Sequence, residues 1–387
     1  MRSTGTAPTL PDGSKVIHIG MPKTGTTALQ TALDAVREQI AEDGVRLIGK
    51  GRHEMKTALA AAGTLAPYYQ DRREERWQEL ATNFRTSDSR VTIWSSEALS
   101  QALPERIPHI AEMLGPDVHV VITLRPLAPL LASQWQEVIR RRGLETLDEW
   151  LRRHFSWVSL DGEVHTTWTR VMPELHRFSL RRLVEQWGSV FGEDRLTFIV
   201  SDPRDRTTNQ RAFEALLGLG PDTLTAEERA NASLPIAEAE LLRQFNIAFT
   251  ERDGDHPTYM NTVSRSGKLA MRELTGLTGQ PIQAPRWAAE RCNDYTRTWI
   301  EAVEASDATV VGDLDHLLVD PADYPEDISP PDSISVTSAG LISELLFESG
   351  LHHVPESHSL PGLDRYPGGD LVRELARRAR QRVGRRR

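Results

Sequence analysis

Cysteine is almost missing from this chain, and so are long hydrophobic runs. Cys292 is the single cysteine among 387 residues, which excludes an internal disulfide and a cysteine-based metal cluster. No run approaches the roughly 20 apolar residues that a helix needs to cross a bilayer. The opening residues are polar and lack the apolar segment of a secretory signal, MRSTGTAPTLPDGSK. We therefore expect a cytoplasmic chain with no transmembrane segment.

An excess of positive charge is also missing. The formal net charge is −9, which argues against a general affinity for nucleic acid or acidic polymers. The arginine-rich carboxyl-terminal end, LARRARQRVGRRR, could contact anionic lipid peripherally, although short basic ends are more often solvated. The remaining composition, 39% hydrophobic and 26% charged, is ordinary for a soluble protein. The length suits one large α/β domain with additions, or two modest domains.

Five short runs rich in β-branched residues are typical of strands in a parallel sheet. Each run is continuous rather than alternating, as expected when helices cover both faces of the sheet. The predicted strands are Val16–Ile19, Val91–Trp94, Val118–Leu124, Leu196–Val200 and Thr309–Val311.

Helical patterns lie between these predicted strands. Alternation of strands and helices on this scale implies a parallel sheet with right-handed crossovers. The sequence therefore predicts an α/β fold of three layers, with a central parallel β-sheet flanked by helices. The clearest helical patterns are Thr26–Glu42, Leu127–Arg142, Leu175–Phe191 and Ala237–Thr250.

Two stretches interrupt the alternation and define the domain organisation. We interpret Gly143–Leu175 and Ala226–Pro285 as helical insertions over the active site, where an acceptor would be recognised. We predict a flexible amino terminus over residues 1–14 and one P-loop-type α/β domain over 15–320. Beyond it, residues 321–387 form a partly ordered extension that is rich in Pro, Asp and Ser and ends in basic residues.

A glycine-containing loop between the first strand and the first helix is the strongest local pattern. It reads KVIHIGMPKTGTTALQTAL over residues 15–33. Gly20 and Gly25 allow a tight turn that exposes consecutive backbone N–H groups. These groups meet the start of a helix, where free donors and the helix dipole favour an anion. Threonine hydroxyls supply further hydrogen-bond donors at the start of this helix, and the Lys23 ammonium supplies a positive charge. The pattern therefore predicts a phosphate cradle.

The position of its lysine separates this loop from the common nucleoside triphosphate loop. Thr26 stands where that loop needs a lysine, and Lys23 lies inside the loop instead. The string PKTGTT closely resembles the 5'-phosphosulfate-binding loop of the sulfotransferase superfamily. The ALQ that follows resembles its bacterial branch, which includes relatives of the carbohydrate sulfotransferases. The resemblance implies 3'-phosphoadenosine-5'-phosphosulfate as co-substrate, bound by Pro22, Lys23, Thr24, Gly25, Thr26 and Thr27.

A second element of the resemblance follows the third predicted strand, in VVITLRPLAPLLASQWQEVIR. Arg125 ends the strand, and Ser133 lies about two turns into the following helix. The spacing is similar to the family's 3'-phosphate-binding element, so the resemblance implies that these two residues hold the donor's 3'-phosphate. A guanidinium suits this role because its fork matches phosphate oxygens. The resemblance covers most of Lys15–Leu318.

Sulfuryl transfer should resemble phosphoryl transfer in having a loose, in-line transition state, so that positioning and charge stabilisation dominate. Lys23 would neutralise the charge that builds up on the departing phosphate oxygen, assisted by backbone N–H groups of the loop. This logic requires no metal. The sequence also shows no carboxylates or histidines clustered at ligand spacing.

An acceptor hydroxyl needs a general base, and the sequence offers two candidates. Glu97, just past the second predicted strand, falls on the same sheet edge and resembles family members that use glutamate there. Alternatively, Glu97 only favours the first turn of a helix. His53, in a polar loop, is the other candidate because its ordinary pKa suits proton transfer near neutral pH. His18 lies on the first strand and is expected to be a packed core residue.

The acceptor is the least defined part of the prediction. A carbohydrate or glycolipid follows mainly from the family resemblance. Trp157, Trp168 and His165 could form a surface for it, or could be packing for a lid. Two other functions stay open at this point. One is a P-loop kinase for a small molecule, against which Thr26 counts, and the other is a nonenzymatic nucleotide- or glycan-binding protein with the same fold.

Overall fold

A computed structural model describes most of the chain. The described residues are 2–4, 7–51, 54–64, 67–167, 172–205, 207–225, 234–254, 259, 279–329, 331, 333–334, 336 and 339–340. The chain divides into two compact units, and the first comprises residues 1–253 and 275–334. The second comprises 254–274 and 335–387, of which few residues are described. The predicted domain limits, 1–14, 15–320 and 321–387, stay a prediction.

A seven-stranded sheet forms the centre of the first unit, and all of its strand pairs are parallel. The strand order is β1-β7-β6-β5-β2-β4-β3. This arrangement confirms the predicted central parallel sheet. The strands are β1 (Arg2–Thr4), β2 (Ser14–His18), β3 (Val45–Leu47), β4 (Val91–Ser95), β5 (Val118–Leu124), β6 (Leu196–Val200) and β7 (Thr309–Val311).

Helices cover both faces of this sheet, which makes the three predicted layers. On one face, α1, α2 and α11 bury apolar side chains such as Leu33, Ile40 and Phe213 against β2, β4 and β6. On the other face, α4 and α10 contact β4 and β5. The helices so far are α1 (Thr26–Ala35), α2 (Arg37–Glu42), α4 (Pro67–Arg85), α10 (Ser189–Phe191) and α11 (Thr208–Leu217).

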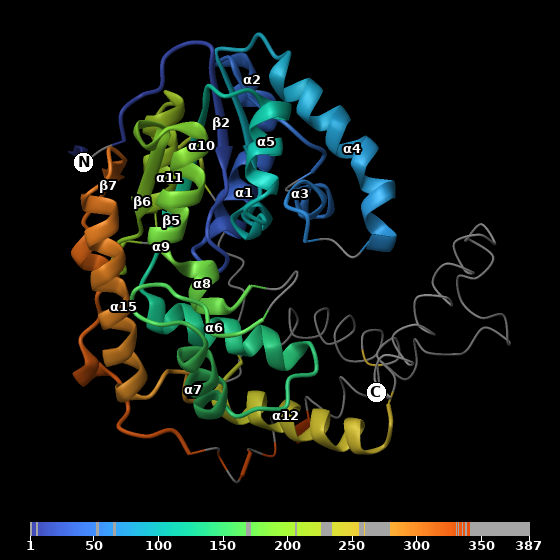
Figure 1. Cartoon of the computed structure of the whole chain (residues 1–387), viewed down its shortest axis with the longest axis vertical. Coiled ribbons are helices and arrows are strands. Elements are labelled where there is room, and N and C mark those ends of the chain that lie inside the picture. The colour runs from blue at the N-terminus through green and yellow to red at the C-terminus, as the bar shows by residue number, and fades with distance from the viewer. Residues whose placement is uncertain are drawn as a thin grey trace, which may run out of the picture. The chain divides into compact units, whose positions relative to one another are not determined.

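The remaining helices include those that lie at the carboxyl ends of the strands. Figure 1 shows α6, α7, α8 and α12 gathered beyond that edge of the sheet. Of these helices, α7 falls within the first predicted insertion and α12 within the second. Further helices of the described chain are α3 (Met55–Ala61), α5 (Arg106–Leu114), α6 (Leu127–Arg140), α7 (Leu147–Trp157), α8 (Glu174–Phe178), α9 (Leu180–Leu183), α12 (Ile236–Glu251), α15 (Arg286–Glu304), the π-helical η2 (Val184–Gly188) and the 3-10 helices η1 (Glu97–Gln101), η3 (Glu193–Arg195), η5 (Leu314–Leu317) and η6 (Pro321–Asp323).

The strand order places three chain segments next to one another. β2 pairs with β4 on one side and with β5 on the other, with Val16 level with Ile93 and His119. The strands that follow β2 in the chain, β3 and β4, lie on one side of it in the sheet. The later strands β5, β6 and β7 lie on its other side, so the direction of strand addition reverses at β2. Ligands of open α/β sheets bind at such a reversal, outside the carboxyl ends of the strands. The loops after β2, β4 and β5 therefore meet where a ligand is expected.

Two predicted helices are broken in the structure. The pattern over Thr26–Glu42 divides at Val36, beyond which the Arg37 guanidinium donates to Asp34 and to the Leu47 carbonyl oxygen. The pattern over Leu175–Phe191 divides at Ser179, whose backbone is extended and whose hydroxyl caps the next helix. Local side-chain hydrogen bonds therefore override a continuous apolar stripe at both places.

The structure also adds strands that the sequence did not reveal. β1 contains no apolar residue, and β3 contains two, so neither has the pattern of a buried strand. β1 nevertheless pairs with β7, and Ala7 and Leu10 after it are buried in the core. The segment predicted as a flexible amino terminus thus contributes an edge strand and core side chains.

Candidate active site

The loop between β2 and α1 turns sharply at three residues with left-handed backbone. The φ angles are +52° at Gly20, +71° at Lys23 and +85° at Gly25. A Cβ atom at Gly20 would lie 2.6 Å from Cγ2 of Thr26, so the close approach of the loop to its own helix requires glycine there. Gly25 precedes the first residue of α1, and its carbonyl oxygen accepts from the Ala28 and Leu29 N–H groups, whereas the Thr26 and Thr27 N–H groups before them start the helix without a preceding turn. The loop therefore has the backbone of an anion cradle.

One hydrogen bond within the loop and one from each of two neighbouring segments hold the loop in place. The Thr24 hydroxyl donates to the Met21 carbonyl oxygen at 2.6 Å. Arg125 donates through Nη1 to the Lys23 carbonyl oxygen at 2.9 Å, and Asn209 donates through Nδ2 to the Thr24 carbonyl oxygen at 3.0 Å. The loop after β2 is thus fixed by the end of β5 and by α11.

A buried polar network lies under the loop. His18 contacts the Ser95 hydroxyl through Nδ1 at 2.8 Å and the Thr123 hydroxyl through Nε2 at 3.3 Å. The Thr123 hydroxyl in turn lies 2.8 Å from the Thr24 hydroxyl of the loop. Burial lowers the pKa of His18 to about 3, so its imidazole is neutral. His18 is therefore a satisfied core residue, as expected from the sequence, and it connects β2, β4 and β5 beneath the loop.

Glu97 lies against the loop from the end of β4. Its Cβ atom is 3.3 Å from where a Cβ of Gly20 would be, and its Oε2 accepts a hydrogen bond from Gln30 Nε2 at 2.8 Å. Gln30 belongs to α1 and also contacts the Ser95 hydroxyl at 3.3 Å. Glu97 begins the 3-10 helix η1, and the Ser96 side chain before it makes no cap hydrogen bond. The carboxylate is therefore oriented by α1 beside the loop.

Lys23 is paired with a carboxylate that the sequence analysis did not single out. Its Nζ lies 3.0 Å from Oε1 of Glu137 on α6, and Arg140 Nη1 lies 2.9 Å from the same oxygen. Burial lowers the pKa of Lys23, and the charge of Glu137 opposes that effect. Burial alone would raise the pKa of Glu137, but Lys23 and Arg140 outweigh it and hold that pKa at about 2. The Glu137 carboxylate is therefore ionised near neutral pH.

Arg125 contacts the same loop, and Ser133 lies on α6, the helix that follows Arg125. Arg125 directly follows β5, is half-buried, and uses one of its five N–H donors on the loop carbonyl. Ser133 is half-buried on α6, one helical turn before Glu137. Because α6 begins at Leu127, directly after Arg125 and Pro126, one short segment carries both predicted phosphate-binding residues.

The structure brings most of the predicted site residues to one place. Lys23, Arg125 and Glu97 meet around the loop, and Ser133 lies one turn from the partner of Lys23. His53, the second candidate base, and Trp168 lie outside the described residues. The other predicted loop residues are divided between the loop and the helix after it. Pro22, Thr24 and Gly25 lie in the loop, and Thr26 and Thr27 are the first two residues of α1.

Residues on helices were missed because sequence spacing alone does not show which face of a helix meets the loop. Glu137 and Arg140 are one turn apart on α6, and Gln30 lies on α1. A signal for Glu137 was present, because it follows Ser133 by four residues and therefore shares its helix face. Nothing in the sequence distinguishes Asn209, which reaches the loop from α11.

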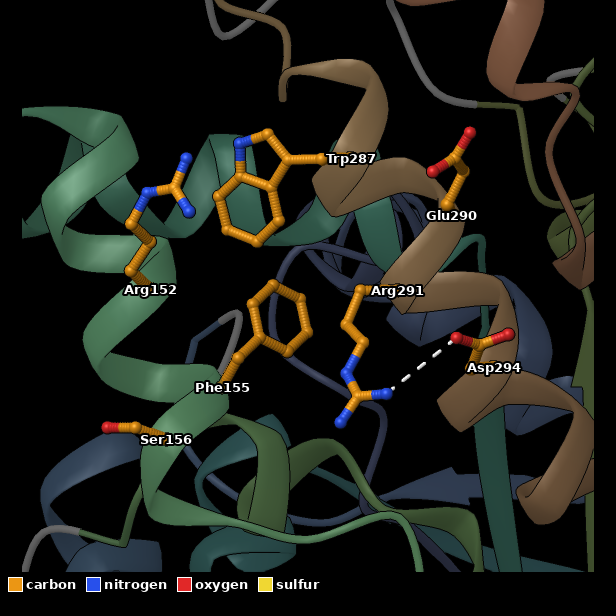
Figure 2. A pocket seen from close by; sticks show the side chains of 7 residues that line it. All are labelled: Arg152, Phe155, Ser156, Trp287, Glu290, Arg291 and Asp294. Carbon is orange, nitrogen blue, oxygen red and sulfur yellow. Dashed lines mark ion pairs between the residues drawn. The ribbon is translucent and has the colours of Figure 1, made fainter.

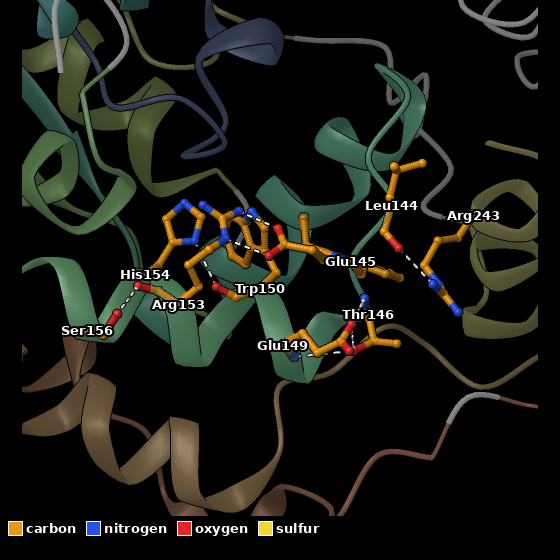
Figure 3. A network of polar contacts seen from close by, with 10 residues as sticks. Leu144, Glu145, Thr146, Glu149, Trp150, Arg153, His154, Ser156 and Arg243 are labelled. Carbon is orange, nitrogen blue, oxygen red and sulfur yellow. Dashed lines mark hydrogen bonds and ion pairs between the residues drawn. The ribbon is translucent and has the colours of Figure 1, made fainter. Parts of the chain in front are cut away.

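The first insertion forms α7, whose start is fixed by a capping box. The Glu149 N–H donates to the Thr146 hydroxyl at 3.3 Å, and the Thr146 N–H donates to the Glu149 carboxylate at 2.9 Å (Figure 3). Near the other end of α7, the Arg153 guanidinium covers the Trp157 ring at 4.2 Å. His165 is exposed. One face of Trp157 is therefore occupied within the protein, which matches the packing alternative for this residue.

An open pocket of about 520 Å³ lies between α7 and α15. Figure 2 shows the rings of Trp287 and Phe155 in this pocket, with α7 on one side and α15 on the other. The Arg152 guanidinium covers Trp287 at 4.4 Å, and Trp287 Nε1 donates to Asp148 at 2.9 Å. None of the predicted donor-binding residues lines this pocket.

The described residues contain neither a candidate metal site nor a candidate membrane-spanning helix. In the part of the chain that the structure describes, no group of three or more His, Cys, Asp or Glu side chains could hold a metal ion. Among the same residues, no helix is both long and apolar enough to cross a membrane.

Comparison with known proteins gives one family and one distant structural likeness. Residues 15–198 match the family model described as "Sulfotransferase domain". The crystal structure of a sulfotransferase from Alicyclobacillus acidocaldarius matches with a TM-score of 0.39 at 16% sequence identity, covering 62% of this chain and 95% of that chain. No curated protein matches the sequence significantly. The matched range contains β2, the loop after it, Glu97, Arg125 and Ser133.

Proposed function

Because this chain belongs to the sulfotransferase superfamily through residues 15–198, we propose that it transfers a sulfuryl group from 3'-phosphoadenosine-5'-phosphosulfate to an acceptor hydroxyl or amine. One observation carries the proposal. The loop with Lys23 stands at the reversal point of a parallel sheet, and the Arg125 guanidinium is bonded directly to it at 2.9 Å. This arrangement supports a site in which the loop would hold one phosphate and the guanidinium would hold another.

The proposed donor site uses the two sides of the loop differently. The backbone N–H groups at the start of α1 and the hydroxyls of Thr26 and Thr27 would hold the 5'-phosphosulfate. Arg125 and Ser133 would hold the 3'-phosphate, for which a guanidinium offers two parallel N–H donors. The left-handed backbone at Gly25 supports this role, because it lets the loop turn directly into the start of α1, where helix N–H groups favour an anion.

The chemical step is an in-line displacement at sulfur. The bond between sulfur and the 5'-phosphate oxygen breaks while a bond between sulfur and the acceptor oxygen or nitrogen forms. Lys23 would stabilise the negative charge on the departing phosphate oxygen. The proton of the acceptor would pass to Glu97, which Gln30 orients at 2.8 Å. No step of this proposal passes through a metal ion.

The acceptor class is proposed as a carbohydrate or glycolipid. This part rests on the resemblance of the loop to the branch that includes carbohydrate sulfotransferases. The helices α6, α7, α8 and α12 lie beyond the carboxyl edge of the sheet, where an acceptor would have to approach the loop (Figure 1). His53 remains a second candidate base in this proposal, and its prediction is unchanged.

Calorimetric titration with adenosine 3',5'-bisphosphate, without magnesium, tests the donor site. The wild-type chain is expected to bind it. Arg125→Ala should weaken binding at least about tenfold, since a charge-assisted bidentate contact contributes roughly 1.5–3 kcal/mol. Lys23→Ala should weaken it as well, whereas Arg204→Ala, an arginine that is 80% exposed outside the site, should not. Glu97→Gln should leave bisphosphate binding intact, because Glu97 is assigned to the acceptor side.

Two outcomes would contradict the proposal. A chain that ignores the bisphosphate but binds ATP with magnesium would be a P-loop kinase. A chain that binds the donor but never transfers sulfur-labelled sulfuryl to any hydroxyl or amine in an acceptor panel would be a nonenzymatic binding protein.

A further inference from the structure

The ammonium group of Lys23, which we assign to the leaving phosphate, is already in an ion pair in the structure. Lys23 Nζ lies 3.0 Å from Glu137 Oε1, and the two side chains are 27% and 15% exposed. They come from different elements, the loop after β2 and the third turn of α6. A partly buried pair is screened by solvent less than a surface pair, so this contact is a substantial interaction.

A bound phosphosulfate and the Glu137 carboxylate would compete for the same cation. Both carry negative charge, and two anions cannot approach one ammonium closely without repelling each other. Glu137 stays ionised near neutral pH, because Lys23 and Arg140 hold its pKa at about 2. The Lys23–Glu137 contact must therefore open, or lengthen, when a phosphosulfate enters the loop.

Arg140 makes this exchange physically feasible. Its Nη1 lies 2.9 Å from the same Glu137 oxygen that Lys23 contacts. When Lys23 leaves, the carboxylate keeps a cationic partner and is not left buried and unpaired, which would be the costly state. Lys23 can thus leave Glu137 Oε1 while Arg140 stays paired with it.

We propose that Glu137 is a positioning residue that pairs with Lys23 while the donor site is empty and releases it to the donor's phosphosulfate when the site fills. This inference rests on the proposed function, since it assumes that the loop binds the phosphosulfate. Ser133 lies one turn from Glu137 on α6, so the helix that would contact the 3'-phosphate also carries the competitor for Lys23. Binding of the 3'-phosphate near Ser133 would thereby be linked, through α6, to the release of Lys23 from Glu137.

Two substitutions with opposite expected effects test the inference. Glu137→Gln removes the competing charge, so adenosine 3',5'-bisphosphate should bind about five- to tenfold more tightly in the calorimeter. Arg140→Gln leaves Lys23 as the only cation on the carboxylate, so the same ligand should bind more weakly than to wild type. A general loss of structure would weaken binding in both variants, and it cannot produce opposite signs. Glu112→Gln, a carboxylate 76% exposed on α5, is the matched control and should change nothing.

Lysine labelling gives a second readout that does not depend on a ligand. The chain has five lysines, so mass spectrometry can follow the rate at which an amine reagent modifies Lys23 alone. Glu137→Gln removes the charge that opposes the lowered pKa of Lys23, and Lys23 should then be labelled faster. Glu137→Asp, which retains the charge, should stay closer to wild type.

The outcomes separate this inference from the proposed function. If wild type binds the bisphosphate, and Glu137→Gln folds but binds it equally or more weakly, Glu137 does not compete for Lys23 and the inference is wrong. If wild type does not bind the bisphosphate at all, the proposed function is wrong instead. If Glu137→Gln fails to fold, the sign of the Arg140→Gln effect decides, and unchanged or tighter binding overturns the inference.

Discussion

Gly20 is the loop residue at which a single added carbon atom should do the most damage. Its φ of +52° already disfavours any side chain, and a Cβ would lie 2.6 Å from Cγ2 of Thr26, which is buried. We predict that Gly20→Ala lowers the free energy of unfolding by more than the roughly 1–2 kcal/mol of a left-handed backbone alone. It should also weaken bisphosphate binding, because the start of α1 must shift.

Gly13 offers a matched control for this prediction. Its φ is +88°, but nothing lies within 4 Å of a Cβ placed there. Gly13→Ala should therefore show only the backbone cost and leave bisphosphate binding unchanged. Urea unfolding and calorimetry of both variants make the comparison. Equal effects at the two glycines would contradict the close approach described for Gly20.

The residues of the candidate site differ in how far sequence could reveal them. Lys23, Glu97 and Arg125 were predictable because each follows a buried strand, and the carboxyl ends of parallel strands meet. The structure brings these three together around the loop. Glu137 escaped because its role depends on the rotation of α6 about its axis, which apolar spacing defines only roughly.

At the scale of elements, the capping box of α7 is a testable source of stability. The Thr146 hydroxyl accepts the Glu149 N–H, and the Glu149 carboxylate accepts the Thr146 N–H in return (Figure 3). Thr146→Ala should lower the free energy of unfolding by about 1 kcal/mol, since one N–H at the helix start loses its partner. Urea unfolding measures this loss.

The other end of the same helix provides the control. Ser156 is exposed, and its hydroxyl donates only to the Arg153 carbonyl oxygen one turn earlier, at 2.8 Å. Ser156→Ala should change the free energy of unfolding by no more than about 0.5 kcal/mol, as is usual for surface positions. A Thr146→Ala variant as stable as Ser156→Ala would show that the capping box contributes nothing.

Strands with continuous apolar runs were predicted well, and the reason is burial on both faces. β5, β6 and β7 have the predicted bounds, whereas β2 and β4 differ by one or two residues at their ends. β3 was missed because its central Arg46 faces solvent, as its buried-exposed-buried pattern shows. Helix breaks at Val36 and Ser179 were missed because side-chain hydrogen bonds, and not apolar periodicity, set them.

At the scale of the whole molecule, buried histidines should make the fold sensitive to acid. Burial lowers the pKa of His18 to about 3, and it lowers those of His119, His154 and His176 to about 4. An unfolded imidazole takes up a proton near pH 6.5, but these folded ones do not. The unfolded state therefore binds more protons below that pH, and the free energy of unfolding falls as the pH falls toward 4.

Urea unfolding at several pH values between about 7 and 5 measures this slope, in a range above the ordinary carboxylate pKa values. For His18, which is fully buried, the contribution approaches about 1.4 kcal/mol per pH unit. His18→Gln should make the slope shallower, whatever it does to stability at pH 7. His165→Gln, at an exposed position, should leave it unchanged. A slope that is identical in all three proteins would contradict the neutral, buried state of His18.

The pairing of β1 with β7 has a consequence for how this chain is made. Arg2 lies level with Thr309 in the sheet, so nearly the whole first compact unit lies between the two partners in the chain. At a ribosomal rate of about 5–20 residues per second, the roughly 300 intervening residues take on the order of 15 to 60 s to synthesise. During that interval β1 has no partner on which to pair. β7 is one of the last parts of the unit to be translated. The amino-terminal strand β1 can therefore take its place in the sheet only after β7 has been made.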